Sequence, residues 1–138
     1  MKLKAKVLIK KISENDIQRA IKDYLQILEN QGKLMFLRNQ AGGYATKEGH
    51  YIKMGKKGSP DLLVWYKTDT TYYKGGSVQS WNKYLKSIAL EVKAEKGKQS
   101  QAQKEWQEKF EKLGGEYYIV RSVDEVIDIM KGEINEGK

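Results

Sequence analysis

Two carboxylates and a lysine are the residues of this sequence whose types and spacing point most directly to chemistry. Asp61 follows Pro60, and Glu91 and Lys93 lie thirty residues further along the chain. Mg²⁺ takes oxygen ligands and keeps several waters, so two carboxylates are a normal protein contribution to its site. A nearby lysine can orient or activate a water and balance negative charge on a phosphate. The pattern predicts a site that holds Mg²⁺ against a phosphodiester.

The segments that carry these residues are typical of β-strands. Residues 61–66 form a dense apolar run, which indicates a strand covered on both faces. In residues 87–94 apolar and polar side chains alternate, so Glu91 and Lys93 share one strand face. Each motif alone also has a structural interpretation, since an aspartate after proline is common in turns. A solvated charged face, however, fits poorly in a strand flanked by helices.

The other apolar patterns predict a small mixed α/β fold in a single domain, residues 1–138. The order α-β-β-β-α-β-α indicates a small mixed sheet flanked by helices. In the second helix we expect Trp106 and Phe110 to belong to the core. The further expected elements are helices over 13–30, 100–113 and from 122 to about 130, and strands over 33–38 and 116–120.

Two segments have no apolar period. Residues 39–59 are rich in glycine and lysine, and a loop of this length is usually functional or disordered. Residues 67–86 read as an extended, aromatic-rich connection with a short helix near 78–85. The connection is expected to contribute to substrate binding or dimerisation, or to be an inert excursion.

The positive charge is unevenly distributed. The formal net charge is +8; residues 1–60 carry 13 Lys and Arg against 5 Asp and Glu, whereas residues 61–138 carry 13 of each. Such asymmetry favours a surface that faces a polyanion, although lysine-rich surface loops alone would also produce it. The candidate nucleic-acid contacts are Arg38, Asn39, Tyr44, Lys47, Lys53, Lys56 and Lys57.

Composition narrows the class of protein. The sequence has no cysteine, which excludes disulfides, thiolate metal sites and a cysteine nucleophile. It has no apolar run long enough for a membrane span, and its N-terminal apolar run is too short for a signal peptide. We therefore expect a cytoplasmic protein that does not enter membranes.

Taken in order, the motifs resemble those of the VRR-NUC (virus-type replication-repair nuclease) family, which belongs to the PD-(D/E)XK superfamily with its restriction-endonuclease-like core. The resemblance covers residues 13 to about 130. It rests on Glu14, Arg38-Asn39, Gly58-Ser59-Pro60-Asp61, Glu91-Val92-Lys93, Gly97, Ser100-Gln101-Ala102-Gln103, Gly114-Gly115 and Val120-Arg121-Ser122. The 67–86 connection departs from the family pattern, because a tight turn is expected there.

The resemblance implies a role for each matching residue. Asp61 and Glu91 would bind the metal together with the backbone carbonyl of Val92, and Lys93 would position or activate the water. Glu14 lies three and seven residues before Ile17 and Ile21, so its helical spacing places it on the core-facing side of the helix. Glu14 would reach the site through water or a second ion. Gln103 would brace the site from its helix.

The resemblance also implies a function. We expect a Mg²⁺-dependent DNA endonuclease, with Mn²⁺ able to substitute, that acts on Holliday junctions or other branched DNA. With one site per chain, cutting both strands requires two chains, so a homodimer is expected. The family name points to a virus or an integrated virus as the source. The alternatives are a non-catalytic nucleic-acid-binding module of the same fold and a sequence-specific restriction-type enzyme.

Overall fold

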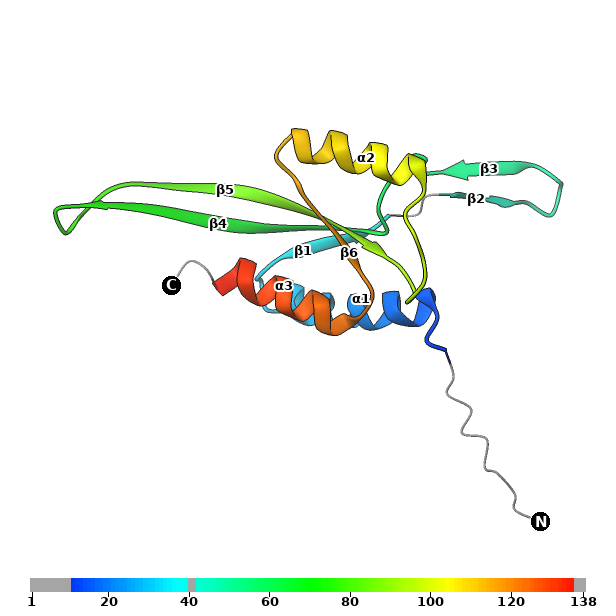
Figure 1. Ribbon diagram of the computed structural model, residues 1–138, viewed down its shortest axis with the longest axis horizontal. Coiled ribbons are helices and arrows are strands. Elements are labelled where there is room, and N and C mark those ends of the chain that lie inside the picture. Colours follow the sequence, from blue (N-terminus) through cyan, green and yellow to red (C-terminus); the bar gives the residue numbers. More distant parts are fainter. Residues whose placement is uncertain (1–10, 40–41, 136–138) are drawn as a thin grey trace, which may run out of the picture.

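A four-stranded mixed sheet between helices forms the centre of the structure (Figure 1). The structure, a computed structural model, describes residues 11–39 and 42–135. Its elements are α1 (Glu14–Asn30), β1 (Met35–Arg38), β2 (Gly42–Ala45), β3 (Tyr51–Met54), β4 (Leu62–Lys74), β5 (Ser77–Val92), α2 (Gln101–Lys112), β6 (Glu116–Val120) and α3 (Val123–Asn135).

The strands of the central sheet follow the order β1-β4-β5-β6. β4 pairs antiparallel with both β1 and β5, whereas β6 runs parallel to β5 after the α2 crossover. Leu62 pairs with Leu90 at the end of the β4–β5 ladder. Asp61 and Glu91, which adjoin this pair, are therefore brought together at neighbouring strand ends. The expected mixed α/β fold is confirmed.

Helices cover both faces of the sheet, with α1 and α3 on one side and α2 on the other (Figure 1). α1 begins at a capping box, in which Ser13 and Asp16 each accept the other's backbone N–H. The core joins side chains of α1, β4, β5, β6 and α3. Its fully buried members include Ile21, Leu25, Leu62, Val64, Ile88, Leu90, Val92, Val120, Val126 and Met130.

The first segment without an apolar period is a hairpin rather than an irregular loop. β2 and β3 pair antiparallel and form a separate two-stranded sheet that projects from one end of the molecule (Figure 1). Tyr51 and Ile52 are exposed. Because these strands project away from the packed core, their sequence has no apolar period to reveal them.

The second such segment is also a hairpin. β4 and β5 stay paired from Leu62–Leu90 out to Lys74–Ser77, so the short helix expected near 78–85 is wrong. The strands join at Gly75-Gly76, whose φ values of +62° and +78° match a tight hairpin turn. The hairpin extends far beyond the helices (Figure 1), so its outer part has no core to pack against.

α3 continues to Asn135, past the point near Lys131 where the sequence pattern fades. Its last turn is fixed to the sheet by Glu133, which accepts hydrogen bonds from Tyr66 and Tyr118 and pairs with Lys86 at 2.8 Å. Burial alone would raise the pKa of Glu133, but hydrogen bonds with Glu116, Lys86 and Tyr66, together with the charge of Lys86, lower it to about 2. Within the described residues, no helix combines the length and apolar character needed to cross a membrane.

Gly58 is a position where the path of the chain towards Asp61 requires glycine. Its φ is +85°, and a Cβ there would lie 2.3 Å from the carbonyl oxygen of Ala102. We expect Gly58→Ala to lower the free energy of unfolding by about 2–4 kcal/mol, through both the strained φ and the backbone clash. Gly49 has the same φ with open space around it, so Gly49→Ala should cost only about 1–2 kcal/mol. Urea unfolding of both variants measures the difference, and equal losses would contradict the close approach.

Candidate active site

Asp61 is held at the entrance to β4 by both its backbone and its side chain. The backbone N–H of Asn39 donates to the Asp61 carbonyl at 2.8 Å, and the Asn39 side-chain amide donates to the Pro60 carbonyl at 3.0 Å. Oδ2 of Asp61 accepts the backbone N–H of Val92 at 2.7 Å. The carboxylate therefore fastens the start of β4 to the end of β5, next to Glu91.

Glu91 is a buried carboxylate with one satisfied oxygen. Oε1 of Glu91 accepts a hydrogen bond from Gln103 Nε2 at 2.7 Å, and Lys93 Nζ lies 3.5 Å from the same oxygen. Oε2 is buried and has no hydrogen-bond partner among the described residues. Burial, followed by the charge of Asp61, raises the pKa of Glu91 to about 8, although Lys93 acts in the opposite direction.

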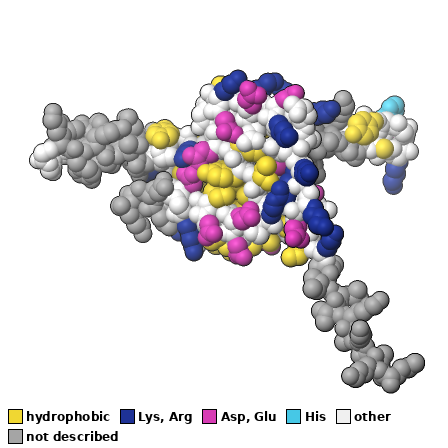
Figure 2. All heavy atoms as spheres, in the orientation of Figure 1, with side chains coloured by type: hydrophobic (Ala, Val, Ile, Leu, Met, Phe, Trp, Pro, Cys, Tyr) yellow, Lys and Arg dark blue, Asp and Glu magenta, His cyan; other side chains and the backbone are white. Residues whose placement is uncertain are grey.

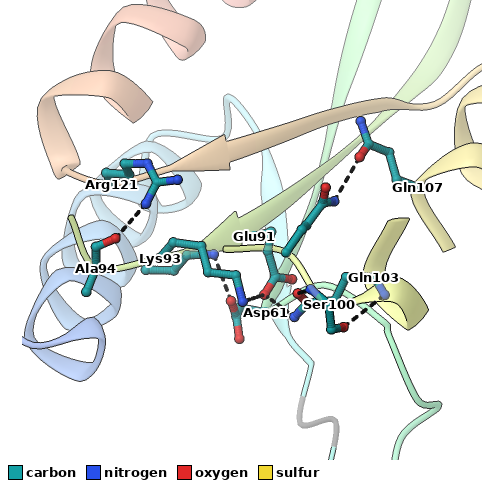
Figure 3. Close-up of polar contacts among 10 residues, drawn as sticks. Asp61, Glu91, Lys93, Ala94, Ser100, Gln103, Gln107 and Arg121 are labelled. Atoms are coloured by element: carbon teal, nitrogen blue, oxygen red, sulfur yellow. Dashed lines mark hydrogen bonds and ion pairs between the residues drawn. The ribbon is translucent and has the colours of Figure 1, made fainter. Parts of the chain in front are cut away.

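Lys93 reaches the same point from the adjoining end of β5. Figure 3 shows the side chains of Asp61, Glu91, Lys93 and Gln103 converging. The Lys93 side chain is 12% exposed, and its backbone N–H donates to the Val120 carbonyl at 3.0 Å. Gly97 packs against its stem, since a Cβ at Gly97 would lie 3.3 Å from the Lys93 Cβ. The stem is thus confined while the ammonium faces the carboxylates.

Gln103 links the site to the start of α2 through both ends of its amide. Its Oε1 accepts the backbone N–H of Ser100 at 2.8 Å, which with the Ser100 hydroxyl completes a capping box. Its Nε2 is thereby directed to Glu91. The helix cap orients the amide towards Glu91, a geometry that fits the bracing role predicted for Gln103.

Because Gln103 both caps α2 and donates a hydrogen bond to Glu91, its replacement should affect stability and activity together. Gln103→Ala removes the hydrogen bond to Glu91 and half of the cap, so we expect the DNA cleavage that the family resemblance implies to fall about 10- to 100-fold and stability to fall by about 1 kcal/mol. Ser100→Ala, the matched control, costs similar stability but leaves the bond to Glu91 in place. Steady-state cleavage rates and thermal unfolding of both variants measure this. Equal activity losses would show that Gln103 acts only as a cap.

The donor set fits a hard divalent cation. Asp61 and Glu91 converge, and the buried Oε2 of Glu91 is an acceptor that no protein donor satisfies among the described residues. No group of three or more His, Cys, Asp or Glu side chains suited to a metal is found within residues 11–39 and 42–135. Two carboxylates and a backbone carbonyl such as that of Val92 match the few protein ligands that Mg²⁺ takes.

Glu14 is placed differently from the inward-facing position expected of it. It is the first residue of α1 and is exposed, whereas the buried stripe of that helix begins at Ile17. Within the described residues, Glu14 does not form, together with Asp61 and Glu91, a group of three side chains that could hold a metal ion. Its role through water or a second ion stays a prediction.

The structure places the candidate nucleic-acid contacts in different settings. Arg38 ends β1 opposite Leu62, one residue from Asp61, and is exposed. Lys47, Lys56 and Lys57 are exposed too. Asn39 instead has a clear structural role in the bond to Pro60. The side chains of Tyr44 and Lys53 lie outside the described part of the structure.

Arg121 is a supporting residue whose role was not deduced from the sequence. Its Nη1 donates to the Ala94 carbonyl at 2.5 Å and to the Glu95 carbonyl at 3.4 Å, which fixes the turn after Lys93 (Figure 3). Together with Lys11 and Lys96 it lines a pocket of about 460 Å³ beside that turn. The only sequence signal was its place in the Val120-Arg121-Ser122 motif.

Comparison with known proteins assigns the family. The VRR-NUC domain matches residues 5–124 of the chain. A solved structure described as a VRR_NUC domain is similar in fold, with a TM-score of 0.50 and 21% sequence identity over 86% of this chain and 94% of that chain. No curated protein sequence matches. Because the family match spans most of the chain, this protein belongs to the VRR-NUC family, a family of nuclease type.

Proposed function

We propose that the protein is a Mg²⁺-dependent DNA endonuclease that prefers Holliday junctions or other branched DNA. The observation that carries the proposal is the convergence of Asp61, Glu91 and Lys93, with one Glu91 oxygen buried and unsatisfied within the described residues. A buried carboxyl oxygen without a hydrogen-bond partner is costly, so its retention at a strand end favours a role that a cation completes.

The reaction is hydrolysis of a phosphodiester. Asp61, Glu91 and the Val92 carbonyl would hold Mg²⁺, which when bound neutralises charge on the phosphate and acidifies water. The ammonium of Lys93 holds a positive charge beside the carboxylates, where it can orient the attacking water. The water oxygen forms a bond to phosphorus while the opposite bond, to the leaving sugar oxygen, breaks and that oxygen takes up a proton.

Basic side chains on both sides of the site support DNA as the substrate. The pocket beside the turn after Lys93 is lined by three basic side chains, Lys11, Lys96 and Arg121. A second pocket is lined by Lys56 and Lys57, which precede Asp61 in the sequence. Figure 2 shows Lys and Arg side chains gathered on the side of the visible face where α1 begins. Lysine and arginine bind phosphates without reading sequence, and the sequence contains no recognisable base-reading module, so selectivity for DNA shape is favoured.

A panel of labelled junction, flap, single-stranded and duplex DNAs, incubated with and without Mg²⁺ or Mn²⁺, tests the proposal. We expect metal-dependent cleavage that is fastest on branched forms and absent in Lys93→Ala. Salt-sensitive binding without turnover on any form would instead identify a binding module. Cleavage restricted to one base sequence would identify a restriction-type enzyme.

The oligomeric state is part of the same proposal. A homodimer would supply the second site needed to cut the second strand. Sedimentation of the protein with and without junction DNA measures this, and a monomer on the DNA with only single nicks produced would overturn the dimer.

A further inference from the structure

A basic and aromatic pocket, here called the α2 pocket, lies between the segment before Asp61 and the exposed side of α2. Its volume is about 380 Å³, within the range of small-molecule sites. The residues that define it are Lys56, Lys57, Trp106, Lys109, Phe110 and Leu113.

The aromatic rings of the α2 pocket are not part of the core, contrary to the expectation from their helical spacing. No residue of α2 is buried. Trp106 and Phe110 stack on each other with ring centroids 4.8 Å apart and are only half-buried. Leu113 beside them is 88% exposed. Surfaces that combine stacked aromatic rings with an open rim suit a flat, partly apolar ligand.

The charge around the α2 pocket selects an anionic ligand. Lys56, Lys57 and Lys109 line it against the single carboxylate of Glu105. Lysines around aromatic rings are the combination by which proteins hold single-stranded nucleic acid, with phosphates on the cations and bases on the rings.

The α2 pocket is fixed at a short distance from the site. Trp106 lies three residues after Gln103, just under one helical turn or about 4.5 Å along α2, and Gln103 contacts Glu91. Lys57 lies on the opposite wall of the α2 pocket. The next residue, Gly58, approaches the backbone of α2 closely, and this contact sets the distance between α2 and Asp61. A turn of helix is comparable to the rise of one or two nucleotides.

We propose that the α2 pocket binds an unpaired nucleobase one or two nucleotides from the scissile phosphate. The base stacks against the Trp106–Phe110 pair, and its flanking phosphates contact Lys56, Lys57 and Lys109. This inference rests on the proposed function and specifies the substrate: DNA that offers a single-stranded nucleotide next to the cut, as at a flap, a gap or an opened junction.

Binding measured without divalent ions tests the inference separately from catalysis. By fluorescence anisotropy in EDTA, we expect duplex DNA with a short thymine overhang to bind about ten-fold more tightly than blunt duplex. Trp106→Ala should remove this preference and change blunt-duplex binding little, whereas Trp106→Phe should retain most of it. Leu113→Glu, at an exposed rim position, should reduce overhang binding without a risk to the fold. Tyr84→Ala, an exposed aromatic on the β4–β5 hairpin, is the control.

A direct readout of stacking uses the double variant Trp65→Phe and Trp81→Phe, which leaves Trp106 as the sole tryptophan. Oligothymidine should quench its fluorescence. Equal affinity for blunt and overhang DNA, an unchanged preference in both Trp106→Ala and Leu113→Glu, or no quenching would each overturn the inference. A protein that shows the preference and the quenching but never cleaves would instead overturn the proposed nuclease function and leave the pocket assignment standing.

Discussion

Replacement of Asp61 by asparagine is expected to lower the DNA cleavage rate by about a thousand-fold or more, which corresponds to about 4 kcal/mol of transition-state stabilisation. The carboxylate would supply one of two anionic ligands to the cation, and the neutral amide cannot replace its charge. The fold should survive, because the amide oxygen of asparagine can still accept the Val92 N–H that Oδ2 accepts in the native site at 2.7 Å.

Asp61→Ala separates the two roles of this side chain. It removes the hydrogen bond to Val92 as well as the charge, so we expect the same loss of activity plus a loss of about 1–2 kcal/mol in unfolding free energy. Single-turnover cleavage at saturating Mg²⁺ and urea unfolding measure the two effects. Asp23→Asn, on the exposed side of α1, is the control and should change neither. An active Asp61→Asn variant would exclude Asp61 from the site.

Replacement of Glu91 by glutamine is expected to abolish cleavage and yet stabilise the metal-free protein at alkaline pH. Glu91 is 3% exposed, and burial beside Asp61 raises its pKa from 4.5 to about 8. Between these two values the folded protein holds a proton that the unfolded chain releases. The contribution of Glu91 to stability is therefore present at low pH and lost as the pH rises towards 8, by up to about 1.4 kcal/mol per pH unit.

Glutamine cannot ionise, so the stability of Glu91→Gln should not show this decline. Unfolding free energies of both proteins in EDTA, measured from pH 5 to pH 9, should diverge as the pH rises. Mg²⁺ should raise the melting temperature of the native protein at pH 8 but not that of Glu91→Gln, because a ligand of the folded state stabilises it. Parallel pH curves would contradict the buried, raised-pKa carboxyl. Glu48→Gln, at an exposed turn, is the control.

The site was more predictable from the sequence than the outline of the molecule. Strand alternation over residues 87–94 placed Glu91 and Lys93 on one face, and the dense apolar run over residues 61–66 placed Asp61 at the start of a core strand. These inferences succeed because buried strands show their packing in their residue pattern. The family motif predicted that Gln103 braces the site from its helix, and the structure places its Nε2 2.7 Å from Glu91 Oε1.

What the sequence concealed were elements with little to bury. The β2–β3 and outer β4–β5 hairpins extend beyond the core, so neither has an apolar period. The placement of Trp106 and Phe110 shows the opposite error, since apolar residues at helical spacing indicated a core face but α2 has no buried residue. Glu14 was expected on the inner face from its spacing to Ile17 and is exposed, because it occupies the first turn, where α1 has just begun.

The long β4–β5 ladder has a consequence for how this protein tolerates changes in chain length. The strands that present Asp61 and Glu91 at one end meet at Gly75-Gly76 at the other, and the pairing is already interrupted by an irregularity between Tyr72 and Tyr73. Residues added or removed near that turn are absorbed in the outer hairpin, while the inner pairs that align the carboxylates stay as they are. The tip is thus a natural point for evolutionary insertions, or for a fused reporter, at a distance from the chemistry.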